Sequence, residues 1–217
     1  MNIDHTSQPA FGDAQGDTLF EAHISERLKG YFLVRSYARS AEPYQVISDL
    51  PEDEALRIAL ENDPIRGSDN YQQRLRTERW LREQVAGGKI QVDKATPVYF
   101  AFTKDPGFIV DLTSRTAPHK EVMTLPAHQV DLSNWSFTMD DHFFADFSAE
   151  GTEGYVFAHA FPHPLHGRVL SAEELIQAID TYGYPQDPYK NNFEAQMWAP
   201  EATRMGLYPN QQLTYET

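Results

Sequence analysis

The stretch Pro97-Val98-Tyr99-Phe100-Ala101-Phe102 decides the fold class of this chain. It is a nearly continuous apolar run rich in strand-forming residues, so it predicts a strand at the centre of a sheet. The sequence as a whole predicts, in order, a strand, two helices, several strands, a helix and a last strand. There is no internal repeat and no change of composition that would mark a linker. This order predicts one α+β domain over residues 19–217.

The remaining elements follow from local signals. Strands are expected over residues 31–37, 44–47, 121–125, 135–138, 155–161 and 193–198. Helices are expected over residues 19–28, after an N-cap at Asp49, over residues 68–86, and from a Ser171–Glu174 capping box to Gly183. Residues 1–18 are polar with few apolar anchors, which predicts a flexible N-terminal arm.

The composition excludes several classes of protein. The chain has 217 residues, with 18 Lys and Arg against 32 Asp and Glu, a net charge of −14. Such a surface disfavours non-specific binding to nucleic acid or to anionic membranes. The chain has no cysteine, so disulfides, zinc–thiolate sites and thiolate catalysis are excluded. With no secretory leader and no apolar run of membrane-spanning length, the sequence predicts a soluble cytoplasmic protein.

Familiar catalytic motifs are missing. The sequence contains neither GxGxxG nor GxxxxGK[ST], the two common phosphate-binding loops. It also lacks the GxSxG nucleophile elbow and the HExxH zinc helix. These absences count against the standard nucleotide hydrolases, the α/β-hydrolases and the zinc proteases.

A histidine cluster is the first positive signal. His159, His163 and His166 lie in the segment AHAFPHPLHG, and three imidazoles are enough for a catalytic metal. Pro162 and Pro164 break any helix that would align the rings. We therefore favour a Pro-rich surface loop and keep a metal-dependent hydrolase as the less favoured alternative.

An arginine-rich helix is the second signal. Five of the 18 basic residues lie between positions 66 and 82, namely Arg66, Arg74, Arg76, Arg79 and Arg82. An anionic ligand would find its positive charge here. The arginines spread around the helix, however, and Glu78 and Glu83 are interleaved with them, a pattern typical of a solvated helix face. We favour that interpretation.

The last predicted strand is the third signal. Phe193, Ala195 and Met197 point to one side of it, and Glu194, Gln196 and Trp198 point to the other. An acid and an amide two residues apart project side by side and could share a cleft. The alternative is an edge strand whose polar side faces water, although Trp198 would then be exposed to solvent.

Three segments together resemble the ADP-ribosyltransferase superfamily, and within it the DarT-like toxins that modify nucleic acids. Residues 97–101 are similar to the central aromatic strand of that family. Residues 135–138 are similar to a later aromatic and polar strand, and residues 193–198 to the strand with the catalytic glutamate. The resemblance implies a split, twisted, mostly antiparallel sheet with flanking helices.

The resemblance implies mono-ADP-ribosyl transfer, a glycosyl-type reaction, from NAD⁺ as substrate to a nucleic acid or protein. Glu194 would stabilise the oxocarbenium-like transition state and Gln196 would orient the acceptor. Arg35 would bind the pyrophosphate. Tyr99 or Phe100 would stack on nicotinamide, and Ser136 would contact the cofactor.

The chain departs from the family pattern in the order of the acid and the amide. The family pattern is Q-x-E or E-x-E with the second position catalytic, whereas this chain has Glu194-x-Gln196. Either Glu194 takes over the role or the activity has been lost. A non-enzymatic acidic protein of the immunity or inhibitor type, steered by its charge to a basic partner, therefore remains open.

Overall fold

A computed structural model describes residues 23–39, 41–86, 90, 92, 94–139, 162–185 and 192–199. The predicted N-terminal arm, residues 1–18, and the predicted strand over residues 155–161 lie outside these ranges. Within them, no helix has both the length and the apolar character needed to cross a membrane.

The sequence folds into one open, six-stranded sheet in the order β3-β1-β2-β6-β4-β5, and every neighbouring pair is antiparallel. The strands are β1 (Phe32–Ala38), β2 (Val98–Thr103), β3 (Lys120–Pro126), β4 (Trp135–Met139), β5 (Val169–Leu170) and β6 (Phe193–Met197). The predicted α+β class is confirmed, and the apolar run at residues 97–102 does form an interior strand.

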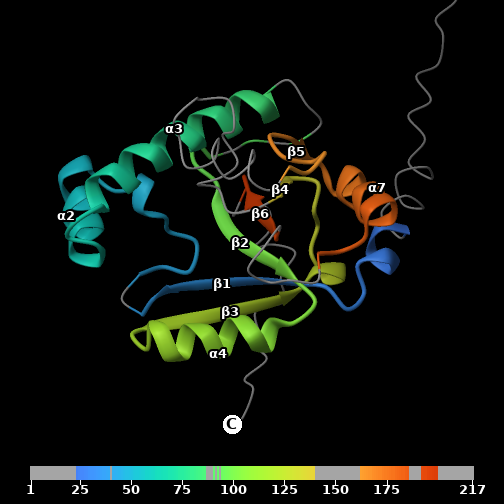
Figure 1. Ribbon diagram of the computed structural model, residues 1–217, viewed down its shortest axis with the longest axis horizontal. Coiled ribbons are helices and arrows are strands. Elements are labelled where there is room, and N and C mark those ends of the chain that lie inside the picture. The colour runs from blue at the N-terminus through green and yellow to red at the C-terminus, as the bar shows by residue number, and fades with distance from the viewer. Residues whose placement is uncertain are drawn as a thin grey trace, which may run out of the picture.

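The sheet divides between β1 and β2. Their ladder begins at Phe32 opposite Thr103 and ends at Val34 opposite Ala101, whereas β1 pairs with β3 as far as Ala38. Over its other half β2 continues its pairing with β6 alone. In Figure 1 the β1–β3 pair accordingly runs across the direction of β2. The two strands diverge from Arg35 onward.

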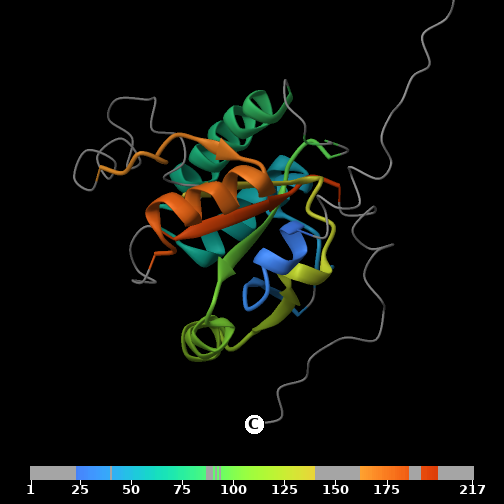
Figure 2. The same ribbon diagram turned by 90° about the vertical axis from the view of Figure 1, so that its right-hand side faces the viewer.

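The main core lies on one face of the sheet, which we call the core face. Alternate residues of the strands supply it, including Val98, Phe100, Phe137, Phe193 and Ala195. Helix α7 (Ala172–Tyr182), drawn in orange in Figure 2, covers this face with Leu175 and Ile176 and contacts β4 and β5. The predicted capping box at Ser171 and Glu174 is confirmed, and Gly183 ends the helix at a φ of 80°.

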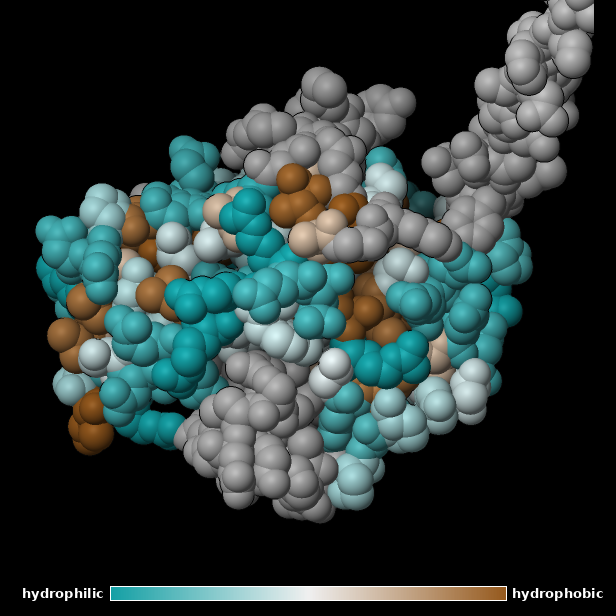
Figure 3. Space-filling view, turned by 90° about the horizontal axis from the view of Figure 1, so that it is seen from above, coloured by the Kyte–Doolittle hydropathy of each residue, from teal (hydrophilic) through white to brown (hydrophobic). Residues whose placement is uncertain are grey.

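Helices α2 (Glu52–Asn62) and α3 (Gly67–Ala86) form a hairpin on the other side. Gly67 permits their close approach, because a Cβ there would lie 2.3 Å from the carbonyl oxygen of Ala59. From above, the face that includes this hairpin is mostly hydrophilic where it is coloured (Figure 3). Arg76, Arg79 and Arg82 are exposed, as the solvated-face interpretation predicts for them.

Three local predictions were wrong or incomplete. Residues 44–47 form no strand, because Tyr44 lies in a turn and Ile47 begins the 3₁₀ turn η1 (Ile47–Asp49). Asp49 is not the N-cap of α2, which is Pro51; its carboxylate instead accepts from the backbone N–H of Val46. Strand β5 and helix α4 (Pro106–Thr116) were not predicted from the sequence. Asp105 is the N-cap of α4, and its side chain accepts from Phe108 N–H.

Candidate functional site

The face opposite the core face, which we call the polar face, gathers the candidate residues of the last strand. Strand register places Gln196 between Tyr99 on β2 and Ser136 on β4. The next row places Glu194 between Ala101 and Thr138. Residues directly opposite one another on neighbouring strands share a face. Two rows of side chains from three strands therefore meet here.

A chain of hydrogen bonds connects these side chains. The Trp198 indole N–H donates to the Ser136 hydroxyl at 2.8 Å, and that hydroxyl donates to Gln196 Oε1 at 2.9 Å. Gln196 Nε2 then donates to Thr138 Oγ1 at 2.9 Å and to Glu194 Oε2 at 3.3 Å. An indole N–H can only donate, so it fixes the direction of the chain. The Gln196 amide is thereby oriented with its NH₂ toward the Glu194 carboxylate.

The members of this chain differ in their access to solvent. Ser136 and Gln196 are 0% exposed, and Thr138 is 1% exposed. Glu194 is the partly exposed member. The structure thus buries the amide and leaves the carboxylate at the boundary with solvent.

Strand β6 is an interior strand, because β2 and β4 flank it. The edge-strand interpretation of its polar side was therefore wrong. Trp198 shares that side because it is buried with Leu81 and Val85 of α3 in a second apolar cluster. Helix α3 and not bulk water covers this end of the polar face.

Arg35 lies at the point where β1 and β2 diverge. Its Nε donates to Pro43 O at 2.7 Å, one terminal nitrogen donates to Tyr99 O at 3.0 Å, and the other to Gln45 O at 2.7 Å. The guanidinium therefore joins β2 to the loop that follows β1. Of its five N–H donors, these contacts use three.

Tyr99 is buried beneath α3. The Arg74 guanidinium lies 4.9 Å from the centre of the Tyr99 ring, within cation–π range. Arg74 Nε also donates to Glu78 at 2.9 Å, and Ser48 donates to the same carboxylate oxygen at 2.9 Å. Glu78 is 3% exposed, so this ion pair faces the sheet.

The charges of this region act on one another. Burial, followed by repulsion from Arg74, lowers the pKa of Arg35 from its usual value to about 10, while Asp49 and Glu194 act in the opposite direction. Burial is also the main cause that raises the pKa of Tyr99 well above its usual value, and the charges of Glu78 and Glu194 raise it further. Glu194, Arg35 and Tyr99 are thus close enough to interact electrostatically.

Phe100 does not belong to this group. It lies on the core face with 1% exposure, and its ring packs 5.0 Å from that of Trp135. Successive residues of a strand point to opposite faces, so Phe100 cannot reach a ligand beside Glu194 when Tyr99 shares that face. The expectation that either ring could stack on nicotinamide therefore fails for Phe100.

The histidine cluster lies elsewhere, and His159 is outside the described residues. The rings of His163 and His166 are 5.8 Å apart, and His163 Nδ1 accepts from the backbone N–H of Leu165 at 3.2 Å. Partial burial, together with the neighbouring His166, lowers the pKa of His163. The described part of the chain contains no group of three or more His, Asp or Glu side chains arranged to hold a metal.

Sequence reasoning missed Arg74 and Glu78 as inward-facing residues. The buried stripe of α3 runs through Tyr71, Glu78, Leu81 and Val85, and Arg74 has only 18% of its side chain exposed. Positions 71, 74, 78, 81 and 85 alternate in steps of three and four, the spacing of one helix face. That spacing was the available signal, and the charges obscured it.

Comparisons with known proteins add no relative. No protein-family model matches the chain, and neither a curated protein nor a solved structure matches it.

Proposed function

We propose that this protein is a mono-ADP-ribosyltransferase-like enzyme that uses Glu194 to cleave NAD⁺ and transfer ADP-ribose to a nucleic acid or protein acceptor. The observation that carries the proposal is the placement of Glu194. Its carboxylate is partly exposed on an interior strand, is contacted by a fully buried amide, and interacts electrostatically with Arg35 and Tyr99.

A carboxylate in this position suits the departure of nicotinamide. The bond between ribose and nicotinamide breaks with positive charge developing on the ribose, and a fixed negative group stabilises that charge. Gln196 holds the carboxylate in one orientation, so little reorganisation is needed during the reaction. Gln196 itself is a positioning residue, because its complete burial keeps it from touching an acceptor.

The reversed order of acid and amide follows from burial. The second position of the Glu194-x-Gln196 pair is 0% exposed between Ser136 and Thr138. A carboxylate there would lose its hydration without gaining a cation. The proposal therefore assigns the chemistry to Glu194 alone. Arg35 would offer its two remaining N–H donors to the pyrophosphate while its other bonds hold the diverging strands.

The test is transfer of a radioactive label from [adenylate-³²P]NAD⁺ in a cell extract. We expect the native protein to label one class of macromolecule, identified by its sensitivity to nuclease or to protease. Glu194→Gln should lose the transfer while keeping the native circular dichroism spectrum. Glu121→Gln, which changes an exposed acid on β3, is the matched control and should keep it. Absence of labelling by the native protein, together with no detectable NAD⁺ binding, would refute the proposal and favour the acidic interaction protein.

A further inference from the structure

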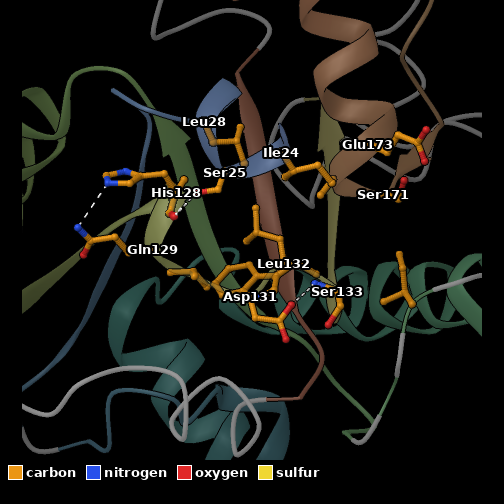
Figure 4. A pocket seen from close by; sticks show the side chains of 15 residues that line it. Ile24, Ser25, Leu28, His128, Gln129, Asp131, Leu132, Ser133, Ser171 and Glu173 are labelled. Atoms are coloured by element: carbon orange, nitrogen blue, oxygen red, sulfur yellow. Dashed lines mark hydrogen bonds between the residues drawn. The ribbon is translucent and has the colours of Figure 1, made fainter. Parts of the chain in front are cut away.

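A pocket of about 620 Å³ lies where β4 begins. Its walls come from five places in the chain: the helical segment around Ile24, Ile90, the turn η2 (Ala127–Gln129), the loop that leads into β4, and the start of α7. Figure 4 shows these walls converging on one space. The volume is in the range of pockets that hold small organic ligands.

The lining of this pocket is largely apolar, and two of its lining residues each carry a buried polar atom that has no partner among the described residues. Ile24, Leu28 and Leu132 supply apolar surface. Trp135 and His128 also line the pocket, and within the described ranges neither Trp135 Nε1 nor His128 Nδ1 has a hydrogen-bond partner. A buried polar atom left without a partner is costly, and such atoms are normally satisfied by water or a ligand. An indole N–H requires an acceptor.

The rim of the pocket is acidic. Asp131 is exposed and Glu173 is partly exposed, and both line the opening (Figure 4). None of the described lining residues is Lys or Arg. The chain as a whole carries a charge of −14, which adds attraction for cations. Charge complementarity therefore favours an amine over an acid.

We propose that this pocket binds a small organic amine that combines an aromatic or aliphatic body with a hydrogen-bond acceptor. The body lies against Ile24, Leu28 and Leu132. The acceptor meets the Trp135 indole, and the ammonium group lies at the rim, where the charges of Asp131 and Glu173 attract it. Trp135 packs in the core face, whereas Glu194 lies on the polar face, so this site is separate from the proposed transferase site.

Three probes with one shape and different charge test the proposal: 4-(aminomethyl)benzamide, 4-methylbenzamide and 4-carbamoylbenzoate. Each carries an amide acceptor, and the charges are +1, 0 and −1. The chain has three tryptophans, so its indole N–H region in a ¹H–¹⁵N NMR spectrum is simple. Trp198, whose N–H donates to Ser136, is the internal control.

We expect the amine to shift the Trp135 indole signal in a saturable way while the Trp198 signal stays in place. The neutral probe should bind about fivefold more weakly, as expected for a partly exposed ion pair, and the acid more weakly again. The double substitution Asp131→Asn, Glu173→Gln should remove the preference for the amine and leave binding of the neutral probe unchanged. Absence of a saturable Trp135 shift with all three probes at about 10 mM would overturn the proposal, as would equal binding of amine and acid.

Discussion

The substitution Gln196→Glu tests whether the second position of the Glu-x-Gln pair is truly interior. It introduces an acid at this position, and it changes one NH₂ group to oxygen with little change of shape. The new carboxylate would lie between Ser136 and Thr138 at 0% exposure, next to Glu194. Burial and a like charge both raise the pKa of a carboxyl group.

Protonation of the new carboxylate limits how far Gln196→Glu can lower the free energy of unfolding. A buried carboxylate costs at most the work of protonating a glutamate with an ordinary pKa, which is about 5 kcal/mol at pH 8 and about 1 kcal/mol at pH 5. Because the pKa would be higher in the folded state than in the unfolded state, the destabilisation is absent below about pH 4 and grows as pH rises. We expect Gln196→Glu to lose about 3–5 kcal/mol at pH 8 and to recover most of this at pH 5.

The matched control is Gln196→Met, which removes the same hydrogen bonds without adding an ionisable group. Counting one bond for the amide oxygen and one for each of the two N–H groups, which share three acceptors, at about 1 kcal/mol each gives a loss of about 3 kcal/mol that changes little with pH. Urea unfolding of the native protein and both variants at pH 5, 6, 7 and 8 measures these quantities. A Gln196→Glu variant as stable as the native protein at pH 8 would show that the amide is not buried as described.

Three further substitutions test individual contacts that stabilise the fold, and urea or thermal unfolding measures the effect of each. Arg35→Lys should cost about 2 kcal/mol, because an ammonium group cannot reach all three carbonyls that the guanidinium contacts, and an unchanged midpoint would contradict its bridging role. Gly67→Ala should cost about 1–3 kcal/mol, because its Cβ would lie 2.3 Å from Ala59 O. Ser171→Ala removes the cap bond to Glu174 N–H and should cost about 1 kcal/mol, whereas Ser171→Asp should largely preserve stability.

The regular elements were largely predictable from local patterns. Alternation identified β6, and the apolar run identified β2, because one face or both faces of these strands are buried. Residues 44–47 were wrongly predicted as a strand because Tyr44 and Val46 favour strands, yet none of the strands that the structure describes pairs with them. Asp105-Pro106, an N-cap residue followed by a proline in the first turn, is a helix-start pattern that the sequence-based prediction did not use.

The site was less predictable because register decides which residues meet. Alternation placed Glu194 and Gln196 on one side, but only strand order shows that Ser136 and Thr138 are their neighbours. Pairing across 58 to 60 residues of sequence has no local signature. Arg74 shows the same limit, since its charge suggested solvent while its position on the α3 stripe placed it over Tyr99.

The most direct measurement of the central claim is the rate of nicotinamide release from NAD⁺, with extract present as the source of acceptor. The account predicts measurable release by the native protein and a loss of at least about a hundredfold in Glu194→Gln, the scale expected when a charge that stabilises a transition state is removed. Equal rates for the two proteins would contradict it.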